Sequence, residues 1–463
     1  MAMLGKRRTA RPASGTSGLR QANKATSRVV SGDDDSVVIE RLAHDGRGVA
    51  HRADGKALFI DRALPGERVL PAVHRQRKRF DEAHVRELLE ASDQRVEPAC
   101  RHFGQCGGCD LQHLADAGQR QHKLAVLGEH LAREALALPA SAEVLAADGH
   151  GYRRRARLGV KVDAQGAIHL GFRGKGSHHL LDIHQCTILV PRLAALLAPL
   201  HHQLAALEAP RHVGHIELID SDAGATLVVR QLREHSGDRE RWQAFAAERG
   251  VSLAWWLGRE AAQLEWLSVA PELGYRIVAD GYDLALTFAP GDFVQVNAAV
   301  NQRLIDTALA WLAPTPAARV LDLYAGVGNL SLALACRGGE VLGVEGNPAM
   351  VERLAANARR NGLGNVEARQ SDLNQAAAVS EVLAWAPNLV VLDPPRDGAD
   401  TVCTQLAASR VPQLLYIACD PATLARDAAR LVQGGYRIRR AAVADMFAQT
   451  AHLEAMLLFE RSG

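Results

Sequence analysis

The sequence of 463 residues lacks any apolar run long enough to cross a membrane, which takes about 20 residues. Its first residues also lack the apolar segment of a secretory signal. Both absences argue against a membrane or exported protein, so we expect a cytoplasmic one. The length predicts more than one domain.

Acidic residues are missing from residues 1–28, where seven of the 54 Lys and Arg residues lie. Because the whole chain has a net charge of only +2, the remainder is slightly acidic, and any contact with nucleic acid must be local. The basic, Ser- and Gly-rich composition predicts a disordered tail over residues 1–30. Two interpretations of this tail stay open: an arm that binds phosphates, and a solvated segment without a partner.

Cysteine is scarce, and the seven cysteines do not have the spacing of a disulfide framework. Three lie close together in Cys100-x5-Cys106-Gly-Gly-Cys109, and Cys186 follows much later. Four thiolates that converge on one centre suit a [4Fe-4S] cluster or a structural zinc ion, and the spacing alone does not distinguish them. Two further cysteines, Cys336 and Cys403, lack such neighbours and are expected in the core.

Residues 36–90 alternate short strand patterns with turns, which favours a small β-barrel of the OB type. A basic patch at residues 74–80 falls between the last two strands and includes aromatic side chains. This mixture favours contact with single-stranded RNA over a solvated loop. Residues 31–92 resemble a TRAM domain, particularly in Gly46-Arg-Gly-Val-Ala50 and Ala63-Leu-Pro-Gly-Glu67.

Residues 93–290 are predicted to form a mixed α/β central domain that carries the four cysteines. A strand near residues 151–160 holds four arginines. An RNA-facing strand and a charged solvent face are equally compatible with this pattern.

From about residue 290, strand patterns alternate with helical ones, which is typical of a doubly wound parallel sheet. The predicted strands are residues 319–323, 340–344, 366–369, 389–392 and 414–418. A helix is predicted over residues 297–312, ahead of the first of these strands. This part of the chain therefore has the pattern of a nucleotide-binding α/β domain.

Several residues at the ends of these strands favour S-adenosylmethionine over NAD as the cofactor. Gly326 and Gly328 allow a ligand to approach the backbone, but Ser331 replaces the third glycine of the dinucleotide fingerprint. Glu345 can accept both ribose hydroxyls, which either cofactor needs. Asp372 is placed to meet an adenine amine, and Asp393-Pro-Pro-Arg396 favours a methyltransferase, because its prolines stiffen a turn at a substrate-facing acid.

Cys419 lies between a buried strand and a helix whose N-cap is predicted at Asp420 or Thr423. Such strand ends are where α/β folds place their chemistry, and the helix dipole there favours the nucleophilic thiolate. By itself, a lone cysteine at this place is more often a packed, inert core residue. The remainder of the chain favours the nucleophile.

The chain resembles the RNA uracil-C5 methyltransferases. The resemblance rests on five motifs: Gly-Asp-Phe-Val-Gln-Val-Asn297, Asp-Leu-Tyr-Ala-Gly-Val-Gly-Asn329, Asp-Pro-Pro-Arg396, Cys-Asp-Pro421 and His452-Leu-Glu454. Together, a TRAM-like barrel and four cysteines resemble the subgroup that methylates uracil 1939 of 23S ribosomal RNA. The basic tail is not part of the family pattern.

This resemblance implies an α/β architecture with an OB-like TRAM barrel, the central domain, and a C-terminal Rossmann-like methyltransferase domain at residues 291–463. It implies a [4Fe-4S] cluster at Cys100, Cys106, Cys109 and Cys186. It also implies contacts to S-adenosylmethionine from Gln295, Tyr324, Asn329, Glu345, Asp372 and Asp393. Tyr324 stands where the family often has phenylalanine.

The implied chemistry is covalent catalysis, in which the Cys419 thiolate adds to C6 of uracil and makes C5 nucleophilic. Glu454 is the candidate base that removes the C5 proton, so that Cys419 can leave. The expected substrate is 23S ribosomal RNA, and the expected protein is a monomer. Three other functions remain open: methylation of another 23S or tRNA uridine, methylation of an adenine amino group, and a non-enzymatic role in ribosome assembly.

Overall fold

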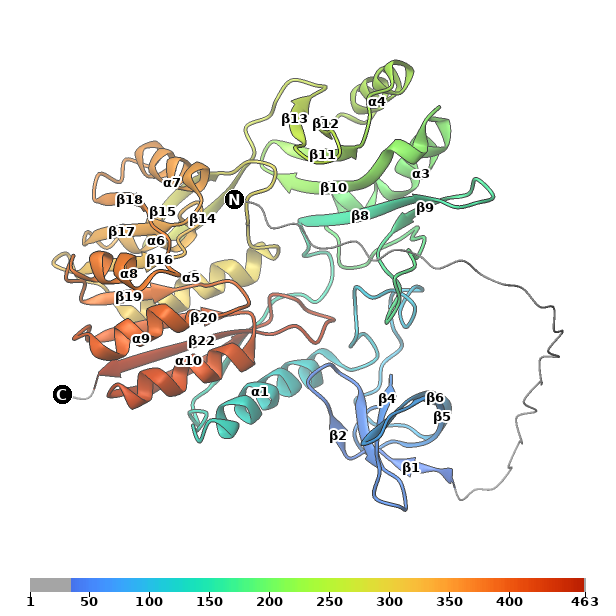
Figure 1. The fold of residues 1–463 in the computed structure, drawn as a ribbon, viewed down its shortest axis with the longest axis horizontal. Helices are drawn as coiled ribbons and strands as arrows, with labels where there is room; N and C mark the ends of the chain where they lie inside the picture. Colours follow the sequence, from blue (N-terminus) through green and yellow to red (C-terminus); the bar gives the residue numbers. More distant parts are fainter. Residues whose placement is uncertain (1–34, 462–463) are drawn as a thin grey trace, which may run out of the picture.

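The computed structural model describes residues 35–461, and the predicted basic tail falls outside this range. Figure 1 shows a small N-terminal β-structure, a second β-rich part with helices α3 and α4, and a large sheet covered by helices on both faces. No helix of the described residues is long and apolar enough to cross a membrane.

The large sheet is formed by eight strands in the order β18-β17-β16-β19-β20-β22-β21-β7. Five of them are parallel, and their bounds agree with the predicted strands within one residue: β16 (Arg319–Leu323), β17 (Glu340–Glu345), β18 (Val366–Gln370), β19 (Leu389–Leu392) and β20 (Gln413–Ala418). All four residues of β19 are buried, as in a strand covered on both faces. The chain order reverses beside β16, which is where such sheets bind ligands.

Two apolar layers cover the sheet. On one face, the core contains side chains of helices α5 (Ala298–Leu312) and α6 (Asn329–Ala335), and of the hairpin β14–β15 (Gly274–Ala279 and Tyr282–Thr287). The other core is formed with α1 (Asp116–Arg133), α8 (Ala376–Leu383), α9 (Asp400–Ala408) and α10 (Pro421–Gln433). Helix α7 (Pro348–Arg360) lies between β17 and β18 in the chain.

Three strands complete the sheet at its β20 edge. Strand β22 (Glu454–Arg461) is antiparallel to β20 and to β21 (Tyr436–Ala444). Strand β7 (Glu143–Leu145) then pairs with β21 in parallel, although it comes from far earlier in the chain. The predicted domain limit at residue 291 stays a prediction, but β7, α1 and the β14–β15 hairpin precede it and contribute to this sheet or its cores.

The central sheet has the order β13-β12-β11-β10-β8-β9. Its strands are β8 (Arg155–Val162), β9 (Ile168–Gly171), β10 (Val213–Ser221), β11 (Gly224–Gln231), β12 (Ser252–Leu257) and β13 (Gln263–Trp266). The helical segments of this part are α2 (Pro191–Ala194), α3 (Leu197–Ala206), η2 (Pro210–His212) and α4 (Ser236–Arg249). Trp242 of α4 and Trp255 of β12 are completely buried in its core.

The N-terminal sheet has the order β1-β5-β6-β4-β3-β2. Its strands are β1 (Val37–Val38), β2 (Arg41–Leu42), β3 (Gly48–His51), β4 (Ala57–Asp61), β5 (Arg68–Gln76) and β6 (Phe80–Glu90). The predicted basic patch spans the end of β5 and the turn to β6. The assignment of this sheet as a TRAM barrel stays a prediction.

Glu67 links this sheet to the cysteine-bearing segment. Its fully buried carboxylate accepts hydrogen bonds from Arg95 and from the backbone amides of Leu64 and Ser92. Burial raises the pKa of Glu67, but the hydrogen bonds from Arg95 and these amides outweigh it and hold the pKa below its ordinary value of 4.5.

We expect Glu67→Gln to destabilise the N-terminal sheet by about 2 kcal/mol, because Arg95 then loses its charged partner. The depressed pKa means that this contribution is fully present above pH 4.5 and is lost as the pH falls through the lower folded-state pKa. The exchange rates of the Leu64 and Ser92 amide hydrogens measure this loss of stability. Glu90→Gln is the matched control, since the Glu90–Arg68 pair is exposed and should contribute little. Equal exchange in both variants would contradict the prediction.

Candidate active site

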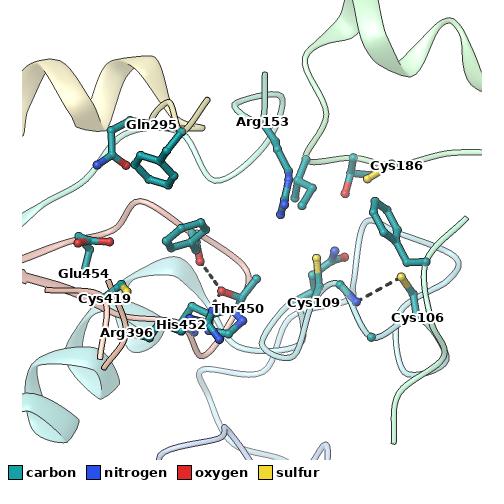
Figure 2. A pocket seen from close by; sticks show the side chains of 18 of the residues that line it. Cys106, Cys109, Arg153, Cys186, Gln295, Arg396, Cys419, Thr450, His452 and Glu454 are labelled. Atoms are coloured by element: carbon teal, nitrogen blue, oxygen red, sulfur yellow. Dashed lines mark hydrogen bonds between the residues drawn. The ribbon is translucent and has the colours of Figure 1, made fainter. Parts of the chain in front are cut away.

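The register of β20 and β22 brings Cys419 and Glu454 together. Ala418 pairs with Ala455 in this antiparallel ladder, so the next residues in register are Cys419 and Glu454. Helix α10 starts directly after the cysteine, and its N-cap is Asp420, which accepts from the amides of Ala422 and Thr423 at 3.0 and 2.9 Å. Figure 2 shows the Cys419 and Glu454 side chains next to each other.

The surroundings of Cys419 hold its thiol protonated. Partial burial, followed by the nearby Glu454 carboxyl, raises the pKa of Cys419 to about 11, and the positive charge of Arg396 opposes this rise. The expected stabilisation of the thiolate by the helix dipole therefore does not dominate in the free protein. Burial and the neighbouring Asp393 also raise the pKa of Glu454 well above its ordinary value.

The loop after β16 approaches the same end of the sheet. Tyr324 and Gly328 have φ of 65° and 101°, so the backbone turns sharply there. The Glu345 carboxylate accepts hydrogen bonds from the amides of Gly326 at 3.2 Å and Asn347 at 2.9 Å, which fixes it at the end of β17. At the end of β19, burial raises the pKa of Asp393 to about 7.

One cavity of about 800 Å³ brings most of the predicted site residues together. Ten of the twelve line it: Gln295, Tyr324, Glu345, Asp393, Cys419, Glu454, Cys100, Cys106, Cys109 and Cys186. Asn329 and Asp372 do not line this cavity. Asn329 exchanges amide hydrogen bonds with Asn301 at 2.9 and 3.0 Å, and exposed Asp372 bonds to Asn374 and Gln375. Their predicted contacts with the cofactor stay predictions.

The four cysteines occupy the other end of this cavity, as Figure 2 shows for Cys106, Cys109 and Cys186. Burial, and then the neighbouring thiols, raises the pKa of Cys109 to about 12. Within residues 35–461, no three of the sulfurs lie within 4.8 Å of one another. Four converging thiols suit either a zinc ion or a [4Fe-4S] cluster.

The cavity wall also contains residues to which the sequence analysis gave no site role. Arg153, Arg396 and His452 line it together with Phe293, whose ring is 63% exposed. Phe293, Arg396 and His452 belong to motifs quoted in the sequence analysis, which assigned them no role. In Figure 2, Arg396 and His452 lie beside Cys419. Arg153 lies nearer to Cys186.

The four arginines near residues 151–160 have different environments. Arg153 faces the cavity, and Arg154 is buried with its guanidinium 4.5 Å from the centre of the Tyr275 ring. Arg155 and Arg157 both approach Glu217, at 2.8 and 3.8 Å. The four arginines therefore form neither a single row that could face RNA nor a single charged face towards solvent.

A second cavity, of about 770 Å³, reaches Cys419 from the N-terminal sheet. Its lining includes His74, Arg75 and Glu82 of that sheet, Lys175 of the central part, and Arg396. Cys419 is therefore accessible from two sides. One side contains the predicted cofactor residues, and the other contains both basic residues, such as Arg75 and Lys175, and acidic ones, such as Asp61 and Glu82.

Comparison with known proteins agrees with this arrangement. The model of a family described as tRNA (Uracil-5-)-methyltransferase matches residues 119–462. The chain belongs to this family. A relative from Halomonas elongata is 57% identical over 99% of this chain and 97% of its own length, and one from Pseudomonas putida is 43% identical over 96% and 98%. Both are named 23S rRNA (uracil(1939)-C(5))-methyltransferase RlmD.

The fold of this uracil-C5 methyltransferase family member also matches a solved structure. The tRNA (uracil-54, C5)-methyltransferase of Pyrococcus abyssi, solved in complex with S-adenosyl-L-homocysteine, superposes with a TM-score of 0.70. The match covers 91% of this chain and 99% of the other, at 22% identity, so it concerns the fold alone. The family assignment confirms the resemblance and sets aside the adenine-methyltransferase and non-enzymatic interpretations.

For this family member, we expect Arg396→Gln to raise the pKa of Cys419 further, because the guanidinium is the positive group that favours the thiolate. The rate of Cys419 alkylation by iodoacetamide at pH 8 should fall severalfold, and raising the pH should restore it. Mass spectrometry of the Cys419 peptide follows the reaction. Arg440→Gln, an exposed arginine of β21, is the control. An unchanged alkylation profile for Arg396→Gln would mean that the guanidinium does not act on the thiol.

Proposed function

We propose that the chain transfers a methyl group from S-adenosylmethionine to C5 of a uridine in 23S ribosomal RNA, at the position equivalent to uracil 1939. The observation that carries this proposal is the cavity in which the β20–β22 register places Cys419 opposite Glu454. The identity of 57% over nearly the whole chain to a relative named for that uracil supports the choice of RNA.

The cofactor would occupy the part of the cavity at the carboxyl ends of β16, β17 and β19. When bound there, S-adenosylmethionine supplies an electrophilic methyl group. Glu345 is fixed by two backbone amides and would accept the ribose hydroxyls. Tyr324 would offer a stacking face, and Gln295 and Asp393 would offer polar atoms from the cavity wall. This donor set fits a nucleoside with a charged amino-acid tail.

Cys419 is proposed to act as the nucleophile. Its thiolate would form a bond to C6 of the uracil, which makes C5 an enolate carbon able to take up the methyl group. Arg396 supports the thiolate against the effects of burial and Glu454. Afterwards the C6–sulfur bond breaks, and Cys419 leaves as the thiolate.

Glu454 is proposed to remove the C5 proton before that elimination. Burial raises its pKa, which makes its carboxylate a stronger base once it is ionised, and Arg396 favours the ionised form. A base next to the nucleophile is needed because both must reach adjacent ring carbons of one uracil. The register of β20 and β22 supplies this proximity.

The uracil must leave its stack to reach Cys419, so we infer that the enzyme binds a flipped or looped-out nucleotide. Phe293 is suited to stack on an extruded base, because its exposed ring lines the cavity. The second cavity would receive the flanking RNA at its cationic side chains, which include Arg75, Lys175 and Arg396, with the proposed TRAM barrel as its outer wall. This supports a role of residues 74–80 in RNA binding.

We also propose that the four cysteines hold a [4Fe-4S] cluster. Their convergence on one cavity supports a shared centre, and the resemblance of the chain to the subgroup that methylates uracil 1939 supports a cluster rather than zinc. The backbone amide of Gly108 donates to Cys106 Sγ at 3.4 Å, as expected where two glycines let the backbone approach the sulfurs.

Glu454→Gln should trap a covalent RNA–protein adduct, because the C5 proton can no longer be removed. The assay mixes the variant with S-adenosylmethionine and deproteinised 23S RNA, and detects a denaturation-stable complex on a gel. Cys419→Ala is the control: it should give neither adduct nor methylation while it keeps cofactor binding. If turnover stops in Glu454→Gln without an adduct, the base lies elsewhere. Adduct formation with tRNA instead of 23S RNA would contradict the proposed substrate and support the proposed mechanism.

Anaerobic purification should yield a protein with a broad absorption band at roughly 400 nm and about four irons per chain. Cys186→Ala should lose both, whereas Cys336→Ala, outside the cysteine group, should keep them. Sulfide analysis completes the measurement. A colourless, zinc-containing protein would contradict the cluster and leave the methyltransferase assignment in place.

A further inference from the structure

The turn between β21 and β22, residues 445–453, leads directly into Glu454 and is held unusually firmly. Three consecutive carbonyls of this turn, those of Phe447, Ala448 and Gln449, each accept hydrogen bonds from a different segment. The donors are Lys123 Nζ at 3.0 Å, Tyr152 Oη at 2.9 Å, and, for Gln449, the backbone amides of Asp110 and Leu111 at 3.0 and 3.1 Å. The turn is therefore shaped by contacts with the first third of the chain.

Gln449 is at the centre of these contacts. It is only 2% exposed, and its backbone has a φ of 68°, a left-handed conformation that is unfavourable for a non-glycine residue. Its amide donates to Gln119 Oε1 at 3.0 Å, and its side-chain oxygen accepts from Gln119 Nε2 at 3.0 Å. Its Nε2 donates to Asp116 at 3.1 Å. A left-handed backbone conformation is retained in a non-glycine residue where the surrounding contacts stabilise it. Here each polar group of Gln449 has a hydrogen-bond partner.

The same residue lies between the cysteine segment and the segment that leads to the proposed base. Asp110 and Leu111, which donate to its carbonyl, directly follow Cys109. The adjacent Ala448 belongs to a small apolar cluster against which Cys109 and Cys186 pack. On the other side, the amide of His452 donates to Thr450 Oγ1 at 3.2 Å, two residues before Glu454. Figure 2 shows Thr450 between His452 and Cys109.

We propose that Gln449 is a positioning residue that couples the order of the cysteine segment to the position of Glu454. The inference rests on the proposed function, since it concerns the base in that reaction. Gln449 does not reach the reacting atoms itself. It holds the turn at the point where β22 begins, so the base reaches C5 only when the segment after Cys109 is also in place.

The test compares Gln449→Asn and Gln449→Gly with Gln231→Ala, another fully buried glutamine that lies on β11 of the central sheet. Both Gln449 variants tolerate the left-handed backbone but cannot reach Asp116 and Gln119 together. Cys419 stays in place, so product release from the adduct should slow by roughly ten- to hundredfold, as a displacement of about 1 Å can cause. The adduct should accumulate, with KM little changed. Gln231→Ala should show no adduct, even if it is less stable.

A second readout does not depend on activity. Hydrogen exchange in residues 110–114 and 445–454 should rise together in both Gln449 variants while iron content and visible absorption stay at the wild-type level. Wild-type protein stripped of iron by a chelator should show the same paired rise. Variants with wild-type release rates, or exchange that rises in only one of the two segments, would overturn the proposal. Failure of the wild-type protein to methylate 23S RNA would instead refute the proposed function, so the two failures are distinguishable.

Discussion

The antiparallel pairing of β22 with β20 is the constraint on which the proposed active site depends. In a purely parallel sheet, the end of β20 would meet other strand ends and loops, whereas here the start of β22 lies opposite it and supplies Glu454. A shift of one residue in this register would turn alternate side chains to the other face of the sheet and separate the acid from the thiol. The side chains of β22 alternate between the two apolar cores, with Leu457 and Phe459 in one and Met456 and Leu458 in the other. A shift of one residue would exchange these faces and disrupt the packing of both cores. The core that stabilises the fold thereby also sets the spacing between nucleophile and base.

Burial creates an electrostatic conflict inside this arrangement. The thiol and the two carboxyls, Glu454 and Asp393, have raised pKa values, and each charged form would disfavour the others. Arg396 is the cation that lowers the pKa of both Cys419 and Glu454. The Cys419 thiol and the Glu454 carboxyl are thus held protonated in the free protein. A protonated thiol is far less reactive than the thiolate.

Much of this could be predicted from the sequence, since it depends on local patterns. The five parallel strands, the helix after Asn297 and the N-cap at Asp420 follow from apolar runs and capping residues, and the structure confirms them. The pairing of β7 with β21 could not be predicted, because three residues that join a distant sheet edge have no periodicity of their own. The different environments of Arg153 and Arg154, which directly precede β8, also escaped prediction, since only tertiary contacts decide which of two neighbouring side chains is buried. The sequence around Gln449 has no motif that marks this residue. Its hydrogen-bond partners Gln119 and Asp116 lie more than 300 positions away in the chain.

Elements that follow the cysteine-bearing segment in the chain are part of the large sheet and its core. Helix α1 packs with α10 in the core of one face, β7 extends the sheet edge, and the buried Lys123 donates to Asp445 at 2.7 Å immediately after β21. Lys123 is 1% exposed, so water cannot replace Asp445 as its hydrogen-bond partner. Removing either residue of the pair would leave the other as an uncompensated buried charge. A domain limit drawn by sequence pattern, such as the one at residue 291, therefore separates residues that pack in one core. The same connections explain why the cysteine loop and the turn before Glu454 are adjacent: α1 and β7 hold both segments against one end of one sheet, and neither can move far without disturbing that core.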